Sequence, residues 1–280
     1  MPTTLTIITE NTVLGKGDAL YGEHGFSLFL ERPDFRLLFD TGPAGLATLH
    51  NAARLGIDLR TADAIALSHG HADHTGGLLG VLRVMAKSVP VFAHPGIFND
   101  RYAKRADGRV SYAGMPYKRE ALEGLGASFD CAASFRTIAD GVYLTGEVPR
   151  RSAFETGDAD LYVRPDGQAR DPLPDDQSLA VETGAGLVLI LGCCHAGLVN
   201  TLDHVQERLP DRPIHMVVGG THLGFAPREQ LERTAAVLKG RGIHRVGLSH
   251  CTGLRAGAYL AKELGEGVEF CNVGWRRSFA

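Results

Sequence analysis

The chemically richest stretch of the sequence is the run His69-Gly70-His71-Ala72-Asp73-His74. Imidazole is the commonest metal ligand in proteins, and histidines grouped with an aspartate are typical of a cation site. Side chains at alternate positions of an extended or turning segment point the same way, so His69, His71 and Asp73 can share one side. His74, at the start of the next helix, points elsewhere. The run can therefore serve two adjacent metal positions.

Further histidines follow predicted strands. The strands predicted over 64–67, 187–191, 214–218 and 245–248 lead into the His69–His74 run, His195, His222 and His250 respectively. Ligands of α/β sheets bind at the carboxyl ends of the strands. Six of the 12 histidines lie at such ends. The pattern predicts a metal centre at one sheet edge.

Alternating strands and helices must position these residues. Apolar runs predict additional strands over 4–9, 26–31, 35–39, 89–93 and 268–273. Amphipathic patterns predict helices over 43–54, 75–87, 198–209, 227–239 and 255–264. This order predicts an α/β protein with helices covering its sheets.

The middle of the chain differs from both flanks. Residues 95–177 are rich in Gly, Pro and charge, and Arg101, Arg105 and Arg109 lie there among tyrosines. One interpretation is a solvated excursion between two halves, 1–94 and about 178–280. The other is a flap over a site, because long irregular segments in compact domains are often functional.

Composition excludes several classes of protein. The 280 residues carry a net charge of −3, whereas general nucleic-acid binding needs a basic surface. The longest apolar run falls far below the roughly 18 residues of a membrane span, and no signal peptide is visible. Five cysteines without framework spacing suit a reducing compartment. We expect a cytoplasmic enzyme with a small-molecule substrate; the sequence leaves its oligomeric state open.

The chain resembles the metallo-β-lactamase superfamily in Asp40 of Leu37-Leu38-Phe39-Asp40-Thr41-Gly42, in the His69–His74 run, in His195 and in His250. The resemblance implies a four-layer αββα sandwich, with 1–280 as one domain. Residues 95–177 would contribute partly to the second sheet and partly to a flap over the metal edge. It also implies a binuclear centre in which His69, His71 and His195 bind one metal and Asp73, His74 and His250 bind the other. Asp40 would orient a ligand from outside.

Within the superfamily, several stretches resemble the 7,8-dihydropterin-6-ylmethyl-4-(β-D-ribofuranosyl)aminobenzene-5′-phosphate synthase group. They are Glu23-His24-Gly25-Phe26-Ser27, Val91-Phe92-Ala93-His94-Pro95, Asp175-Asp176-Gln177, Gly192-Cys193-Cys194-His195-Ala196-Gly197 and His250-Cys251-Thr252-Gly253. On this basis His24 and His94 are candidates to line the pocket, and Asp176 is a candidate acid outside the ligands. Each also has a structural interpretation, as a satisfied histidine or a turn residue.

One stretch departs from the superfamily pattern. The strand that usually ends in a metal-bridging aspartate here ends in Gly219-Gly220-Thr221-His222, without a carboxylate. His222 is the available donor, but a neutral imidazole cannot bind two cations at once. Either the metals share only a hydroxide, with His222 bound to one of them, or the second site is weak. Cys193, Cys194 and Cys251 adjoin ligands and can bind zinc, although small buried residues at strand ends are more ordinary.

The expected activity is hydrolysis of an anionic, phosphorylated small molecule by a metal-bound hydroxide that Asp73 orients. Arg101, Arg105 and Arg109 would bind the substrate, and no residue stands out as a separate general acid. Two divalent ions are expected, zinc first, with manganese or iron as alternatives. The alternatives are a transferase of the synthase type, a di-iron redox protein, disfavoured by a histidine at position 71, and a non-enzymatic metal-binding module.

Overall fold

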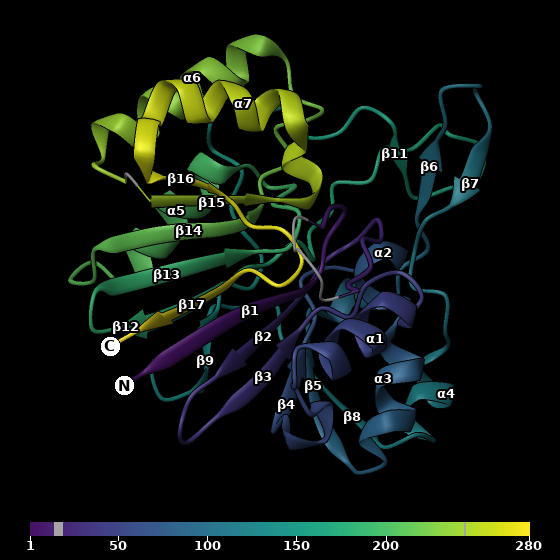
Figure 1. The fold of residues 1–280 in the computed structure, drawn as a ribbon. Helices are drawn as coiled ribbons and strands as arrows, with labels where there is room; N and C mark the ends of the chain where they lie inside the picture. The colour runs from purple at the N-terminus through teal and green to yellow at the C-terminus, as the bar shows by residue number, and fades with distance from the viewer. Residues whose placement is uncertain (14–18, 244) are drawn as a thin grey trace.

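The computed structural model describes residues 1–13, 19–243 and 245–280. Two seven-stranded sheets pack face to face, with α6 (Arg228–Gly240) and α7 (Gly253–Leu264) outside one sheet and α1 (Leu46–Arg54) and α3 (Leu78–Met85) outside the other (Figure 1). The remaining helices are α2 (Ala72–Thr75), α4 (Arg119–Glu123) and α5 (Leu198–Arg208). The predicted αββα architecture is confirmed.

The strands of each sheet come from distant parts of the chain. The first sheet has the order β17 (Arg276–Phe279), β1 (Thr3–Thr9), β2 (Ser27–Glu31), β3 (Arg36–Phe39), β4 (Ala64–Ala66), β5 (Val89–Ala93) and β8 (Ala127–Cys131). The second has the order β16 (Val268–Phe270), β15 (Arg245–Ser249), β14 (Ile214–Gly220), β13 (Gly186–Leu191), β12 (Leu179–Thr183), β10 (Val142–Leu144) and β9 (Arg136–Ala139). A small third sheet consists of β11 (Leu161–Tyr162), β6 (Tyr102–Lys104) and β7 (Val110–Tyr112).

Successive side chains of a strand point to opposite faces of its sheet, and the buried apolar side chains form three cores. On β13, Leu187, Leu189 and Leu191 pack under the helices of the second sheet. Val188 and Ile190, on the other face of the same strand, pack against the first sheet. A strand buried on both faces reads as a continuous apolar run, which is why this segment was recognisable from the sequence. The result is a rigid β13 whose carboxyl end delivers Cys193 and His195.

Glycines shorten two of the predicted helices. The first begins at Leu46 instead of residue 43, because Gly45 adopts φ 74°. The helix predicted over 75–87 is interrupted between α2 and α3, at Gly76 and Gly77. A Cβ at Gly76 would overlap the Pro43 carbonyl oxygen, so this close approach requires glycine. The interruption sets the direction in which the His69–His74 run enters the site.

Residues 95–177 contribute strands to both sheets, whereas a contribution to the second sheet alone was expected. Strand β8 from the middle segment joins the first sheet, whereas β9 and β10 join the second. The unpredicted strand β17 pairs with β1, so the carboxyl terminus completes the first sheet. The third sheet projects from the body, at the right of Figure 1. Among the described residues, no helix is long and apolar enough to span a bilayer.

Candidate metal centre

The histidines at the predicted strand ends converge between the two sheets. His69, His71, His74, His195, His222 and His250 form a connected series of ring contacts with centroids 4.3 to 5.0 Å apart. All except His222 are buried. Strand β4 delivers the first three, and the parallel strands β13, β14 and β15 deliver the others from the facing sheet. The site therefore lies where the edges of both sheets meet.

The first donor group contains His69, Cys193 and His195, with His71 beside them. His69 Nε2 lies 3.3 Å from His195 Nε2 and 3.0 Å from His71 Nδ1. His71 Nε2 is buried and has no hydrogen-bond partner within the described ranges. These nitrogens are close enough for one small cation to reach several of them.

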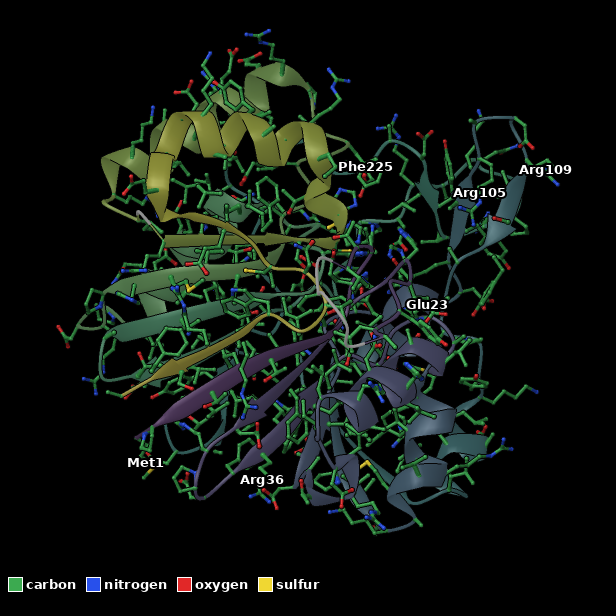
Figure 2. All side chains as sticks on the ribbon, in the orientation of Figure 1. Met1, Glu23, Arg36, Arg105, Arg109 and Phe225 are labelled. Atoms are coloured by element: carbon green, nitrogen blue, oxygen red, sulfur yellow. The ribbon has the colours of Figure 1, made fainter. Side chains whose placement is uncertain are left out.

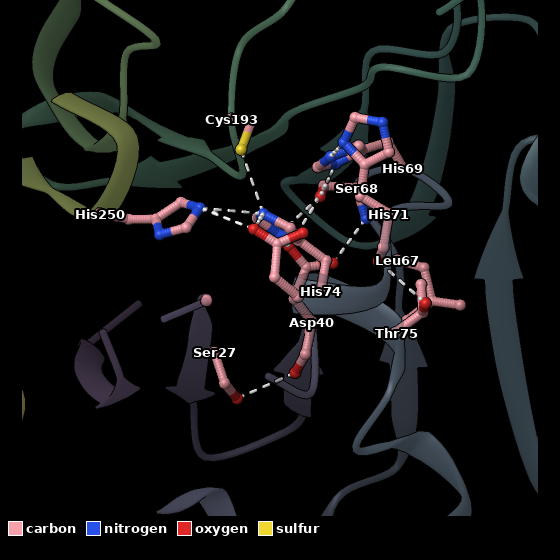
Figure 3. Close-up of polar contacts among 12 residues, drawn as sticks. Ser27, Asp40, Leu67, Ser68, His69, His71, His74, Thr75, Cys193 and His250 are labelled. Carbon is pink, nitrogen blue, oxygen red and sulfur yellow. Dashed lines mark hydrogen bonds and ion pairs between the residues drawn. The ribbon is translucent and has the colours of Figure 1, made fainter. Parts of the chain in front are cut away.

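The second donor group contains Asp73, His74, Cys193 and His250. Asp73 Oδ2 lies 3.4 Å from His250 Nε2 and 3.8 Å from His74 Nε2. The two ring nitrogens are 3.2 Å apart, and Cys193 Sγ lies 3.1 Å from His74 Nε2. Figure 3 shows His74, His250 and Cys193 pointing toward one another from three different segments. A carboxylate, two imidazoles and a thiol thus share one small volume.

The second ring nitrogen of four of these histidines bonds outward. The Nδ1 contacts are His74 with Asp40 Oδ2 at 2.7 Å, His195 with Asp158 Oδ2 at 2.8 Å, His250 with Asn11 Oδ1 at 2.9 Å and His69 with Ser68 Oγ at 2.9 Å. A neutral imidazole that donates from Nδ1 keeps its lone pair on Nε2. Four Nε2 lone pairs therefore face one another, an arrangement that a cation between them stabilises. The residues present fit a metal centre.

Asp40 connects His74 to the backbone and side chain of Ser68 through buried hydrogen bonds. It is fully buried, and besides His74 it accepts hydrogen bonds from Ser68 N and Ser68 Oγ, both at 2.7 Å. Its φ of 58° is left-handed, as are those of Cys194 (62°), His222 (55°) and His250 (50°). Such non-glycine conformations cost about 1–3 kcal/mol each and cluster at functional sites. Four of them at the ends of strands lining one cleft are consistent with a site whose geometry is maintained against strain.

Burial and neighbouring charges set the protonation of the donors. Burial lowers the pKa of His69, His71 and His195 well below the usual value, and lowers that of His250 to about 4. Burial would raise the pKa of Asp73, but nearby His74 and the hydrogen bonds to His24 and His250 hold it well below its usual value. His74 is the exception, because despite its burial the Asp73 and Asp40 carboxylates raise its pKa. The other imidazoles of the two donor groups are neutral, around an ionised carboxylate. That is the protonation state that a metal requires.

His24 and His94 have different environments. His24 lies at the rim of the second donor group, with its side chain 69% exposed and Nε2 3.4 Å from Asp73 Oδ2. The hydrogen bond to Asp73 raises the pKa of His24. His94 instead caps the 3₁₀ helix over Pro95–Phe98, where its Nδ1 accepts from Gly96 N at 3.0 Å. His94 belongs to neither donor group in the part of the chain that the structure describes.

Asp175 and Asp176 support the two histidine loops through the backbone. Asp175 Oδ2 accepts from Gly70 N, and Asp176 Oδ2 accepts from Ala196 N, both at 2.8 Å. Burial raises the pKa of Asp176 to about 6. The expected outer acid therefore contacts the loop beside His195 and is positioned to maintain its shape.

The three arginines expected to bind substrate separate into different roles. Arg101 is 1% exposed, with Nη2 2.7 Å from Asp175 Oδ1 and Nε 3.6 Å from Asp171 Oδ2. Because two carboxylates neutralise it in the interior, the expectation for Arg101 is corrected to a structural role. Arg105 and Arg109 lie on the projecting third sheet (Figure 2). Arg109 is paired with Asp107 at 2.7 Å.

His222 groups with Asp158 and His195, apart from the two donor groups defined above. His222 Nδ1 lies 3.4 Å from Asp158 Oδ1, and its ring centroid is 4.3 Å from that of His195. His222 was expected to bind one metal and not to bridge two, and its grouping with Asp158 and His195 leaves that expectation as a prediction. The sulfur of Cys193, in contrast, belongs to both donor groups.

Three contributors were missed in the sequence. Asp158, Glu10 and Asn11 contact His195 Nδ1, His250 N and His250 Nδ1 respectively. Asp158 lies in an irregular, glycine-containing stretch with no periodic signal. Glu10 and Asn11 directly follow the carboxyl end of β1. Because site residues of α/β sheets lie at such ends, the sequence did contain a signal for them.

Comparison with known proteins identifies the family of this chain. A sequence model of the metallo-beta-lactamase superfamily matches residues 20–216. The chain is 30% identical over 268 residues to a 7,8-dihydropterin-6-methyl-4-(beta-D-ribofuranosyl)-aminobenzene-5'-phosphate synthase of Methanocaldococcus jannaschii, covering 93% of this chain and 91% of the relative.

Solved structures extend the similarity to the whole length. One described as a metal-dependent hydrolase of the beta-lactamase superfamily has a TM-score of 0.82 and 28% identity, covering 98% of each chain. A diphosphatase of the PhnP family shares the fold, with a TM-score of 0.55 and 14% identity, over 100% of this chain and 98% of that one. The family model over residues 20–216 and the shared fold show that this chain belongs to the metallo-β-lactamase superfamily.

Proposed function

We propose that the protein is a metal-dependent hydrolase of an anionic, phosphorylated small molecule. The observation that carries the proposal is the set of four histidines that bond outward through Nδ1 and turn Nε2 inward, beside the carboxylate of Asp73. Divalent cations bound there would act as Lewis acids and would lower the pKa of a coordinated water. The donors suit zinc, and also manganese or iron.

The proposed ligand sets follow the two donor groups. His69, His71 and His195 would hold one cation, and Asp73, His74 and His250 the other. Asp73 stays ionised, so its carboxylate can accept a hydrogen bond from the attacking water and orient it.

Charge supports an anionic substrate. Two divalent cations would bring four positive charges, whereas Asp73 is the one carboxylate in the first and second donor groups. Arg105 adds a cation on the third sheet, and its charge is felt at His24, on the rim of the site. A phosphate meeting this rim would gain favourable electrostatic interactions from both sources.

We propose that the third sheet is a flap over the substrate. The segment following β7 is attached to the metal-binding run, since Ala72 N donates to Ala113 O and Tyr117 Oη donates to Gly76 O, both at 2.9 Å. A movement of this sheet would therefore be transmitted to the segment that carries His71 and Asp73.

A second candidate is transfer of a dihydropterin group from its pyrophosphate to an arylamine ribose phosphate. The 30% identity to a synthase over 93% of the chain favours it. Both reactions use cations to neutralise phosphate, so the donor set supports them equally.

Product analysis in ¹⁸O-labelled water separates the two. Zinc-loaded protein would be given phosphate esters and diphosphates in one series, and the dihydropterin pyrophosphate with the arylamine in the other. Hydrolysis puts the solvent label into a product, whereas transfer forms the carbon–nitrogen bond and leaves the label in water. Turnover that continues undiminished after metal has been removed by chelation would refute both.

The ligand sets are tested by elemental analysis. His195→Ala should lose the ion of the first donor group and Asp73→Asn mainly that of the second. His215→Ala is the control, because His215 lies at the start of β14 and packs against Phe279. Full occupancy in His195→Ala would contradict the assignment.

A further inference from the structure

Cys193 is the residue that both donor groups share. Its Sγ lies 3.1 Å from His74 Nε2 in the second group, and within 4.8 Å of the donor atoms of His69 and His195 in the first. The residue is 3% exposed. Figure 3 shows its side chain directed at His74, on the side where His250 also approaches. One sulfur atom is thus within reach of two sets of ligands.

Strand β14 cannot supply the shared ligand that the superfamily pattern leads one to expect. A Cβ at Gly219 would overlap the Leu191 carbonyl oxygen, and one at Gly220 would lie 2.6 Å from Cys251 Sγ. Both positions must therefore remain glycine, and neither can project a side chain toward the site. The neighbouring strand β13 passes close enough to cause this crowding, and it carries Cys193.

The backbone that follows β13 packs against Ser68 and Asp40, the residues that contact the Nδ1 atoms of two site histidines. A Cβ at Gly192 would lie 2.5 Å from Ser68 Cβ and 3.1 Å from Asp40 Oδ2, so this backbone packs directly on the residues that orient His69 and His74. Cys251 Sγ donates to Cys193 O at 3.4 Å. These contacts determine where Cys193 Sγ lies.

The adjacent cysteine has the opposite orientation. Cys194 packs in the core beneath the helices of the second sheet, and its Sγ lies 3.4 Å from Thr201 Oγ1 of α5. It is as deeply buried as Cys193. The sequence alone could not distinguish the two cysteines. In the structure the turn after β13, where Cys194 has a φ of 62°, directs Cys193 toward the histidines and Cys194 into the core.

We propose that Cys193 binds as a thiolate and is the ligand shared by the two metals, in the role left vacant by the missing carboxylate. The inference rests on the proposed metal-dependent function. On metal binding the S–H proton leaves to solvent and the sulfur electron pair forms the bond to the cation. Thiolate is a strong ligand for zinc and cobalt, and its negative charge adds to that of Asp73.

The test is substitution with cobalt(II), whose thiolate complexes absorb in the near ultraviolet. Wild-type protein loaded with cobalt chloride should show this charge-transfer band. Cys193→Ala should lose the band. Its cobalt affinity should fall by more than the roughly 10- to 100-fold lost when a residue that only hydrogen-bonds to a metal ligand is replaced. Cys194→Ala should keep both, because its sulfur lies outside the two donor groups and packs in the core. Circular dichroism checks that each variant folds.

A second measurement covers the case in which Cys193→Ala does not fold. X-ray absorption at the zinc edge of wild-type protein should contain a sulfur neighbour at about 2.3 Å, unchanged in Cys194→Ala. Cys193→Asp should regain cobalt binding without the charge-transfer band. If the wild type binds cobalt without sulfur ligation, or if Cys193→Ala keeps the band, the Cys193 inference is overturned and the metal-dependent function stands. If the wild type binds no divalent metal, both are overturned.

Discussion

Asp158 gives the sharpest test of how the site is held, because it contacts two histidines from a segment far from them in sequence. Its Oδ2 lies 2.8 Å from His195 Nδ1 and its Oδ1 3.4 Å from His222 Nδ1. The side chain is 16% exposed, so Asp158→Asn should fold normally. The amide keeps the size of the side chain and one acceptor oxygen, but removes the charge that makes His195 a stronger donor to metal.

We expect Asp158→Asn to weaken zinc binding by about 10- to 100-fold, which corresponds to about 1.4–2.7 kcal/mol. Asp158→Ala should cost more, since it also removes the oxygen that orients the ring. Competition titration against a chromogenic chelator measures the affinity directly.

Asp160→Asn is the matched control. Asp160 lies two residues away with an exposed side chain, and its substitution changes the net charge equally. Equal zinc affinities for the Asp158→Asn and Asp160→Asn proteins would refute the reasoning, because the effect would then be net charge and not orientation of His195.

The remaining predictions concern pH, a buried ion pair and a glycine. Despite its burial, His74 in the second donor group has a pKa raised by the Asp73 and Asp40 carboxylates, whereas burial lowers the pKa of the first group's His69 and His195. Protons should therefore displace the ion of the second group at a higher pH than that of the first, as measured by zinc retained after desalting; loss of both ions at one pH would contradict this. Arg101→Met should lower the free energy of unfolding in urea by about 3–5 kcal/mol, since it leaves buried Asp175 unpaired, whereas Arg105→Met should change it by less than about 0.5 kcal/mol. Gly220→Ala should lower both the melting temperature and the zinc content because its Cβ meets Cys251 Sγ, while Gly240→Ala, which points into open space, should lower neither.

The sequence determined the positions of the ligands along the chain. Strands such as β13 are encoded by local apolar runs, and the histidines follow those runs directly. Because parallel strands end at a common edge, His195, His222 and His250 could be assigned to one site without any tertiary information. The αββα layers followed from the same alternation together with the resemblance to the superfamily.

Only the tertiary structure decided which partners complete that site. Asp158 reaches His195 from 37 positions away, and Asn11 reaches His250 from 239 positions away. Local patterns carry no record of such contacts, because loop closure depends on the packing of the whole chain.

The same limit explains the corrected residues. Arg101 reads in the sequence as one of several flap cations, but burial beside Asp175 makes it structural. Cys193 and Cys194 are identical in type and adjacent in sequence, and they differ only in the direction of the side chain. Both follow the end of β13 at Leu191, where the left-handed backbone of Cys194 (φ 62°) departs from strand alternation. The local turn and the packing of the two sheets therefore decide that Cys193 faces the histidines and Cys194 the core.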